Sequence, residues 1–245
     1  MWSYPHVLAH RGGGTLAPEN TLAALRCAVA LGFRAVEFDV MAVRDGELVL
    51  MHDPMLGRTV RGEGCVADFT VDELSAMDAG SWHSTLFIGE PVPSFTAAAD
   101  FCLAHGLWMN AEIKPAPGLD AYTGQQVAAA CKHLPAGSVL LSSFSVAALE
   151  AAQAEAPEVP RALLVNSIPD DWAHQLHTLA AVALHVNARS LTSLQATAVK
   201  RAGFGLLCYT VNVPEHARAL QSLGVDAICT DRLDLIGAGF FENAD

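Results

Sequence analysis

Short apolar runs and longer amphipathic stretches alternate along the whole chain, and this alternation restricts the fold more than any other feature of the sequence. The apolar runs predict nine strands, at 7–11, 35–41, 48–53, 109–114, 139–144, 161–166, 182–188, 205–211 and 226–230. The amphipathic stretches predict eight helices, at 19–31, 94–105, 119–134, 145–155, 170–180, 191–202, 214–223 and 232–241. Such an alternation predicts a parallel sheet with helices on its outside.

One further pattern favours a closed barrel over an open sheet. Nearly every predicted strand begins apolar and ends polar, as residues 109–114 (MNAEIK) illustrate. The strands of a (β/α)8 barrel all end on one face, whereas an open doubly wound sheet gathers its polar ends at one switch point. The extra run at 48–53 follows 35–41 across Asp45-Gly46, which is a hairpin signal. We therefore expect a (β/α)8 TIM barrel with one added antiparallel strand.

The stretch 54–93 is the least regular part of the chain. It contains five glycines and one short helical pattern, at 70–77. A segment of this size is too short to bury a core of its own. We expect residues 1–245 to form a single barrel domain, in which 54–93 is a small insertion over the barrel mouth.

Composition limits the partners and the compartment. The formal charge of −12 argues against nucleic-acid binding. No apolar run approaches the roughly 20 residues that span a bilayer, and Met1–His6 lacks the pattern of a signal peptide. The six cysteines form no Cys-x-x-Cys pair and are expected to be free thiols. We expect a cytoplasmic protein without stable membrane insertion, acting on a small molecule, and homo-oligomerisation is left open.

Three carboxylates fall within predicted strands. Glu37 and Asp39 are two residues apart and so share a face of their strand, as do Glu112 and Lys114 on another. Unpaired buried charge costs several kcal/mol, and a divalent cation would compensate it. Oxygen ligands favour one Mg²⁺, with Ca²⁺ or Mn²⁺ as alternatives. A purely structural network of carboxylates with lysine or arginine is the other interpretation.

Two histidines and an arginine also lie at strand ends. His10 and His52 could together accept and donate a proton, because the ordinary pKa of imidazole is about 6.5. Arg11 has a planar fork that suits phosphate oxygens. A salt bridge from Arg11 to Glu19 or Glu37 is the alternative. The other eight histidines are expected to be solvated or to serve in packing.

Together these segments form a recognisable ordered set. They are His10-Arg11-Gly12, Pro18-Glu19-Asn20-Thr21, Glu37-x-Asp39, His52-Asp53-Pro54, Glu112-Ile113-Lys114, Ser143-Phe144, Tyr209-Thr210-Val211-Asn212 and Asp226–Arg232. The set resembles the glycerophosphodiester phosphodiesterase family, in its cytoplasmic bacterial type, from residue 7 to about 235. Each motif alone is weak, but their common order and spacing make the resemblance specific.

The resemblance implies a barrel of the phospholipase C-like phosphodiesterase type. It also implies metal-dependent hydrolysis of glycerophosphodiesters to glycerol 3-phosphate and an alcohol. By matching motif, the site residues would be Glu37, Asp39 and Glu112 as metal ligands, His10 and His52 as the acid–base pair, and Arg11 and Lys114 on the phosphate. Tyr209 stands where the family usually has tryptophan and would form an aromatic wall against the substrate. The resemblance leaves open which histidine is the acid, and whether water or the glycerol 2-hydroxyl attacks.

Two other functions compete with this one. The same barrel could act on lysophospholipids, as a lysophospholipase D-like enzyme, if it had an exposed apolar groove. It could also be a non-catalytic barrel that only binds phosphate or metal. The second alternative is disfavoured because both histidines and all three carboxylates are present.

Overall fold

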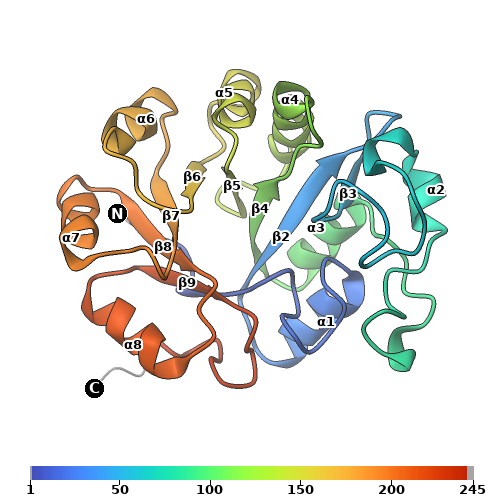
Figure 1. Ribbon diagram of the computed structural model, residues 1–245, viewed down its shortest axis with the longest axis horizontal. Helices are drawn as coiled ribbons and strands as arrows, with labels where there is room; N and C mark the ends of the chain where they lie inside the picture. Colours follow the sequence, from blue (N-terminus) through green and yellow to red (C-terminus); the bar gives the residue numbers. More distant parts are fainter. Residues whose placement is uncertain (1, 242–245) are drawn as a thin grey trace.

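The computed structural model describes residues 2–241, and its strands form a closed parallel barrel with the helices outside (Figure 1). The barrel strands are β1 (Val7–Ala9), β2 (Ala35–Ala42), β4 (Trp108–Ile113), β5 (Val139–Ser143), β6 (Arg161–Val165), β7 (Ala183–Asn187), β8 (Gly205–Tyr209) and β9 (Ala227–Thr230). Strands β4 to β9 follow one another in order, β9 pairs with β1, and β1 pairs with β2 to close the ring. The predicted (β/α)8 TIM barrel is confirmed.

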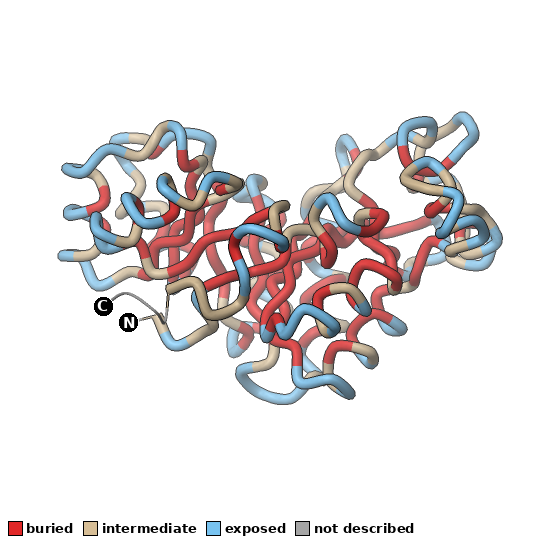
Figure 2. The backbone as a smooth tube through the Cα atoms, turned by 90° about the horizontal axis from the view of Figure 1, so that it is seen from below, coloured by how far each residue is buried: buried red, intermediate tan, exposed pale blue. Residues whose placement is uncertain are grey.

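The helices cover the outer face of the barrel. They are α1 (Leu22–Ala30), α3 (Phe95–Ala104), α4 (Asp120–Cys131), α5 (Val146–Glu155), α6 (Trp172–Thr178), α7 (Ser193–Arg201) and α8 (Pro214–Ser222). Figure 2 shows that the strands and the helix faces toward them are buried, whereas loops and outer helix faces are exposed. Among residues 2–241, no helix is long and apolar enough to cross a membrane.

The side chains of each strand divide between two layers. On β2, the outward Val36, Phe38 and Val40 pack in the large cluster between strands and helices. The alternate residues Glu37 and Asp39 point to the inside of the barrel, because successive side chains of a strand face opposite sides. The charged pair therefore lies inside the barrel, as the spacing predicted.

Apolar side chains close the amino-terminal end of the barrel. Small and aliphatic residues from several strands meet Trp108 there, and Trp2 and Tyr4 pack against them. The ring of Tyr4 stacks on that of Trp108 with their centroids 4.8 Å apart. Because this end is filled, the polar groups gather at the other end of the barrel.

The extra strand β3 (Leu48–Leu50) pairs antiparallel with β2, as the Asp-Gly turn predicted. Beyond it lie η1 (Val66–Asp68), α2 (Val71–Ser75) and η2 (Thr85–Phe87). Residues of this segment, among them Val66 and Leu74, pack with Met41 and Val49 in a third apolar cluster. This packing fixes the segment 54–93 to the end of β2 and to β3, next to the polar end of the barrel.

Among the described residues, one predicted helix is absent, and another begins three residues later than expected. The stretch 232–241 forms turns rather than a helix, and it contains Gly237 and Gly239. Each glycine costs about 1 kcal/mol relative to alanine inside a helix. The first helix begins at Leu22 instead of residue 19, with Thr21 as its N-cap. Residues 19 and 20 are held in a loop by contacts with the site described below.

Helices α4 and α5 touch at Gly124, and the contact leaves no room for a side chain. A Cβ atom at this position would lie 2.1 Å from the carbonyl oxygen of Ala148. We expect Gly124→Ala to lower the melting temperature, because such overpacking costs about 1–3 kcal/mol. Thermal unfolding followed by circular dichroism measures this. Gly237→Ala is the control, since its Cβ would meet nothing within 4 Å; equal melting temperatures for the two variants would contradict the expectation.

Candidate active site

Three carboxylates meet at the carboxyl ends of β2 and β4. Asp39 and Glu112 are register partners on these adjacent strands, and Glu37 lies two residues before Asp39, on the same face of β2. One oxygen from each of the three groups lies within 4.8 Å of the others. All three side chains are buried. The structure thus brings together the predicted metal-ligand set, in a geometry that could hold one cation.

Two cations partly neutralise this cluster. Lys114 Nζ donates to Glu112 Oε1 at 2.7 Å and lies 3.4 Å from Asp39 Oδ1. Arg11 Nε lies 3.5 Å from Asp39 Oδ2. Burial and the charge of Asp39 raise the pKa of Glu112 to about 8. Ionising all three buried carboxylates beside only two cations is therefore costly, and a bound divalent cation would offset this cost.

His10 follows β1 and is held by an aspartate from the other end of the chain. Its Nδ1 lies 2.5 Å from Asp231 Oδ1, and Asp231 Oδ2 accepts a hydrogen bond from the amide of Asn212 at 2.9 Å. Burial alone would lower the pKa of His10. The hydrogen bond with Asp231 and the charges of Glu37 and Asp231 outweigh burial, and the pKa is raised.

His52 is also held at Nδ1 by an aspartate, but this aspartate has a different environment. Its Nδ1 lies 2.6 Å from Oδ1 of the adjacent Asp53. The other oxygen of Asp53 accepts from Arg58 Nε at 2.5 Å. Burial lowers the pKa of His52, and the positive charges of Arg11 and Lys114 lower it further. The negative charge of Asp39 raises the pKa, but not enough to outweigh these effects. The two imidazoles are thus shifted in opposite directions.

The loop before α1 ties these groups together. The carboxylate of Glu19 accepts from Arg11 at 2.7 Å and from both terminal nitrogens of Arg58 at 2.7 and 2.8 Å. Asn20 has a φ of 56° and clamps Asp39, donating to its side chain at 2.8 Å and accepting from its backbone N–H at 3.0 Å. His52 is therefore linked to Arg11 through Asp53, Arg58 and Glu19. The salt bridge from Arg11 to Glu19, which was the alternative interpretation for this arginine, is present.

Aromatic side chains border the cluster on the side of β5 and β8. Tyr209 lies next to Phe144, edge to face, with centroids 5.9 Å apart, and its hydroxyl donates to the carbonyl of Val165. Lys114 Nζ lies 5.7 Å from the centroid of Phe144. Tyr209 thus forms a wall beside Glu112 and Lys114, and its hydroxyl is held by the backbone.

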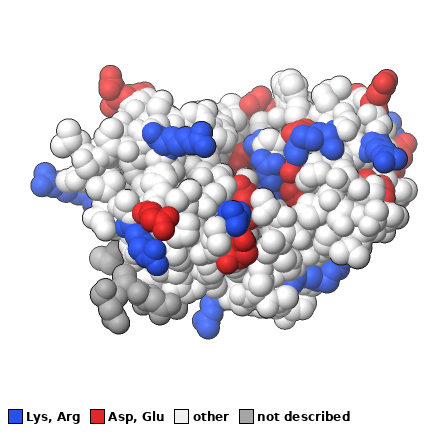
Figure 3. Space-filling view, turned by 60° about the horizontal axis from the view of Figure 1, so that its bottom comes forward, with Lys and Arg blue, Asp and Glu red and all other residues white. Residues whose placement is uncertain are grey.

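An open cavity of about 420 Å³ leads to the site. It is lined by His10, Arg11, Gly14, Thr15, Glu19, Trp82, His83 and Asp231. Trp82 and His83 come from the segment 54–93, so this segment contributes to the cavity wall. On the molecular face in Figure 3, cationic side chains are scattered and several lie against acidic ones. The cavity is of small-molecule size.

Several residues that organise the site had no individual role predicted from the sequence. Asp231 ends its apolar run in the same way as the residues that were singled out, so the strand-end pattern could have identified it. Asn20 and Asn212 belong to the sequence motifs, but no role was predicted for either residue. Arg58 lies in the irregular segment and carried no signal. His185 was expected to be solvated or packing, and it is fully buried on β7, inside the barrel.

A parallel barrel with two aspartate-held imidazoles, a carboxylate cluster and two cations at its open end defines a barrel hydrolase for phosphate esters. Residues 10–235 match the family model described as the glycerophosphoryl diester phosphodiesterase family. The chain belongs to this family.

Relatives with known sequences or structures agree over nearly the whole chain. A glycerophosphodiester phosphodiesterase of Caldanaerobacter subterraneus subsp. tengcongensis is 32% identical over 92% of this chain and 93% of its own. A phosphodiesterase of Oleispira antarctica, solved in complex with the product sn-glycerol-3-phosphate, is 37% identical, with a TM-score of 0.89 over 93% of each chain. A glycerophosphodiester phosphodiesterase of Agrobacterium tumefaciens is 26% identical, with a TM-score of 0.79 over 95% of this chain and 98% of its own.

Proposed function

We propose that this protein hydrolyses glycerophosphodiesters to glycerol 3-phosphate and an alcohol, with His10 and His52 as the acid–base pair and a divalent cation bound nearby. One observation carries the proposal. Each imidazole is held at Nδ1 by an aspartate, which orients the ring and leaves Nε2 for proton transfer at the mouth that holds the carboxylate cluster. The glycerol 3-phosphate product in the related Oleispira enzyme supports this substrate class.

The carboxylate cluster fits a hard divalent cation. Glu37, Asp39 and Glu112 would hold it, since they offer oxygen ligands only, and a divalent cation would favour their ionised forms over the raised pKa of Glu112. We propose Mg²⁺, with Ca²⁺ or Mn²⁺ as alternatives. When bound, such a cation supplies positive charge to the phosphate and makes an oxygen nucleophile more acidic.

Arg11 and Lys114 are proposed to hold the phosphate. Arg11 Nε is buried and has no hydrogen-bond partner among the described residues, although it lies within ion-pair distance of Asp39. A buried donor without a partner is costly, and a phosphate oxygen would satisfy it. Lys114 borders the same cluster, beside the aromatic wall of Tyr209 and Phe144. Both cations would stabilise the charge that develops on the phosphate in the transition state.

The charges around the two aspartates separate the roles of the histidines. Asp231 accepts from the neutral Asn212 and forms no salt bridge with an arginine or lysine of the described chain, so its charge acts mainly on His10. Asp53 is shared with the cation Arg58, and His52 receives less of its charge. An imidazole that keeps its proton suits the general acid, and one that loses it suits the general base. We therefore assign His10 as the acid that protonates the leaving alcohol and His52 as the base that activates the nucleophile.

The shared aspartate leads to a pH-dependence prediction. Arg58→Gln leaves Asp53 paired with His52 alone, which raises the pKa of His52. Because the base must be deprotonated, the acidic limb of kcat/KM against pH is expected to move to higher pH. Arg26→Gln, which removes an exposed pair with Glu90, is the control. An acidic limb at the same pH in Arg58→Gln and wild type would contradict the assignment of His52 as base.

A substrate panel tests the proposed activity. Glycerophosphocholine, glycerophosphoethanolamine and lysophosphatidylcholine are each incubated with Mg²⁺-loaded protein, and the products are identified. We expect glycerol 3-phosphate from the first two, with release of choline and ethanolamine. Phosphocholine and glycerol as products would show cleavage of the other ester bond, and no product from either diester would refute the proposal.

One observation favours the lysophospholipid alternative enough to keep that substrate in the panel. An open groove of about 550 Å³ is lined by Leu16, Leu86 and Ile88 but also by Arg26 and Glu90, and Leu16 is the sequence neighbour of Thr15, which lines the open cavity. An acyl chain could lie in such a groove. Faster turnover of lysophosphatidylcholine than of the water-soluble diesters would shift the proposal to a lysophospholipase D-like activity.

We also propose that the chain works as one cytoplasmic barrel domain. All six cysteines are unpaired, which suits a reducing compartment. The segment 54–93 supplies Trp82 and His83 to the cavity wall and thus supports its place as an insertion at the mouth of that domain.

A further inference from the structure

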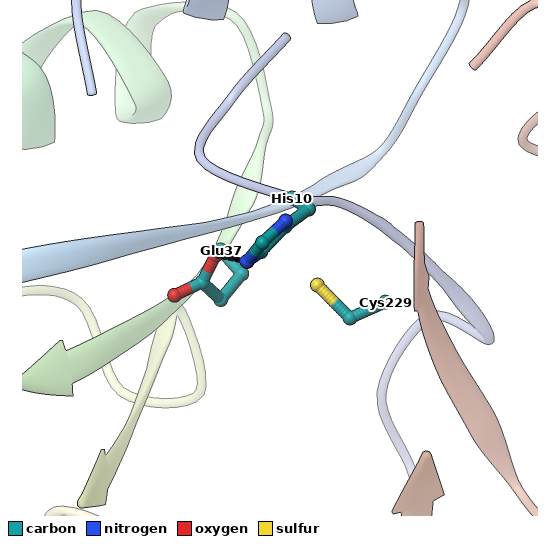
Figure 4. Close-up of side chains that lie close together, drawn as sticks. All are labelled: His10, Glu37 and Cys229. Carbon is teal, nitrogen blue, oxygen red and sulfur yellow. Dashed lines mark ion pairs between the residues drawn. The ribbon is translucent and has the colours of Figure 1, made fainter. Parts of the chain in front are cut away.

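A histidine, a glutamate and a cysteine from three elements point toward one another beside the carboxylate cluster (Figure 4). His10 follows β1, Glu37 lies on β2 and Cys229 on β9, and one ligand atom of each lies within 4.8 Å of the others. His10 Nε2 is 3.8 Å from Glu37 Oε2, too far for a hydrogen bond. A nitrogen and an oxygen at roughly 2.0–2.2 Å from a tetrahedral zinc ion are about 3.3–3.5 Å apart. The observed spacing exceeds this by a few tenths of an ångström, so that a small movement of either side chain would let the pair share a cation.

The hydrogen bond between Asp231 and His10 is a second, independent indication of a metal site. A histidine that binds a metal commonly donates its other ring N–H to a carboxylate, which fixes the tautomer and orients the free nitrogen. Asp231 holds Nδ1 of His10 in this way, at 2.5 Å, and directs Nε2 toward Glu37 and Cys229. Glu37 and Cys229 are buried, so that a cation held here would be largely shielded from solvent.

A small internal cavity adjoins the same three side chains. Its volume is about 30 Å³, and its wall also includes Asn110 and His185. Both are buried, and Asn110 Oδ1 and both ring nitrogens of His185 have no hydrogen-bond partner in the described part of the chain. Such a volume holds one water molecule. A water here could donate to Asn110 Oδ1 and to one ring nitrogen of His185, and could complete a four-coordinate site.

The ligand chemistry of the trio differs from that of the carboxylate cluster. Glu37, Asp39 and Glu112 offer only oxygen, which hard cations prefer, whereas His10 and Cys229 add nitrogen and sulfur, which zinc prefers. Burial raises the pKa of Cys229, which argues against a role as a nucleophile at neutral pH. A bound metal would displace the thiol proton to solvent and leave the thiolate as ligand.

We propose that His10, Glu37 and Cys229 form an inhibitory site for a borderline-soft divalent cation, Zn²⁺ in the first place. The inhibitory consequence rests on the proposed function. A cation on Nε2 of His10 occupies the lone pair that would carry the proton, and it withdraws Glu37 from the hard-cation set. Bound zinc would thus stop turnover without occupying the place that Arg11 and Lys114 provide for the substrate phosphate.

Cobalt absorption tests the site without reference to activity. Co²⁺ is titrated into the full chain, and a thiolate ligand gives a sulfur-to-cobalt charge-transfer band in the near ultraviolet. We expect the band in wild type and its loss in Cys229→Ala. Cys27→Ala and Cys65→Ala, which change the two partly exposed cysteines, are expected to keep it. No band in wild type, or an unchanged band in Cys229→Ala, would overturn the site.

Zinc inhibition tests the consequence. With Mg²⁺ present, we expect Zn²⁺ to inhibit wild type. Cys229→Ala should need at least about tenfold more Zn²⁺ for the same inhibition, because the loss of a ligand lowers metal affinity at least as much as the loss of a ligand's hydrogen-bond partner. Cys229→Val, closer in volume, replaces alanine if the alanine variant does not fold. Equal inhibition of wild type and variant, or turnover supported by Zn²⁺, would overturn the proposal. Absence of any turnover with Mg²⁺ would instead refute the proposed function, whereas the cobalt titration would still test whether Cys229 binds a metal.

Discussion

His10→Ala is expected to lower kcat for glycerophosphocholine by at least about 10²-fold, the usual contribution of a positioned acid or base. The loss should depend on the leaving group. Choline leaves as a poor alkoxide that needs a proton, whereas p-nitrophenolate leaves without one. On the p-nitrophenyl ester of glycerol 3-phosphate, His10→Ala is therefore expected to lose much less activity. Initial rates on both substrates at saturating Mg²⁺ measure this difference.

His52→Ala provides the contrast, because a base acts on the nucleophile and not on the leaving group. We expect it to lose at least about 10²-fold on both substrates. His133→Ala, which changes an exposed histidine at the end of α4, is the control and should keep full activity. Activity within a few-fold of wild type in both His10→Ala and His52→Ala would refute the acid–base pair. A leaving-group dependence in His52→Ala alone would reverse the two roles.

Asp39→Asn is expected to have the second large effect, a loss of Mg²⁺ binding and of at least about 10²-fold in kcat/KM, because metal-site support alone contributes 10–100-fold. Asp39 is the central carboxylate, in contact with Arg11, Lys114 and Asn20. The amide has nearly the same shape but removes one negative charge. Isothermal titration with Mg²⁺ and rates over a range of Mg²⁺ concentrations measure the two losses.

A matched variant separates this effect from a general loss of structure. Asn20→Ala removes only the clamp on Asp39, and we expect it to weaken Mg²⁺ binding by about 10–100-fold while high Mg²⁺ restores part of the rate. Glu150→Gln, on the exposed face of α5, should change neither quantity. Unchanged Mg²⁺ affinity in Asp39→Asn would exclude this carboxylate as a ligand.

The barrel and most of the site could be predicted because both depend on local sequence pattern. Strand periodicity places Glu37 and Asp39 on one face, and a parallel barrel brings all strand ends to one mouth. The position of Glu112 beside Asp39 follows from adjacency of β2 and β4. The pairing of Arg11 with Glu19 was one of the two interpretations weighed for this arginine, and the structure contains it.

The remaining features depend on contacts between distant parts of the chain. Asp231 reaches His10 across 221 positions, and Arg58 reaches Glu19 across 39. No period or spacing reports such contacts. The helix expected at 232–241 followed from the alternation alone, but its glycines favour turns. Likewise, Glu19 and Asn20 fit a helical pattern, yet the bonds they make to Arg11 and Asp39 hold them outside α1.

The central claim is that a divalent cation and the histidine pair together hydrolyse a glycerophosphodiester, and metal removal tests it most directly. Wild-type protein is stripped with a chelator, and glycerophosphocholine turnover is followed by phosphorus NMR before and after Mg²⁺ is restored. We predict no glycerol 3-phosphate from the stripped protein and full recovery with Mg²⁺. Undiminished release of glycerol 3-phosphate after thorough chelation would contradict the metal site, and no release with any of Mg²⁺, Ca²⁺ or Mn²⁺ would contradict the activity itself.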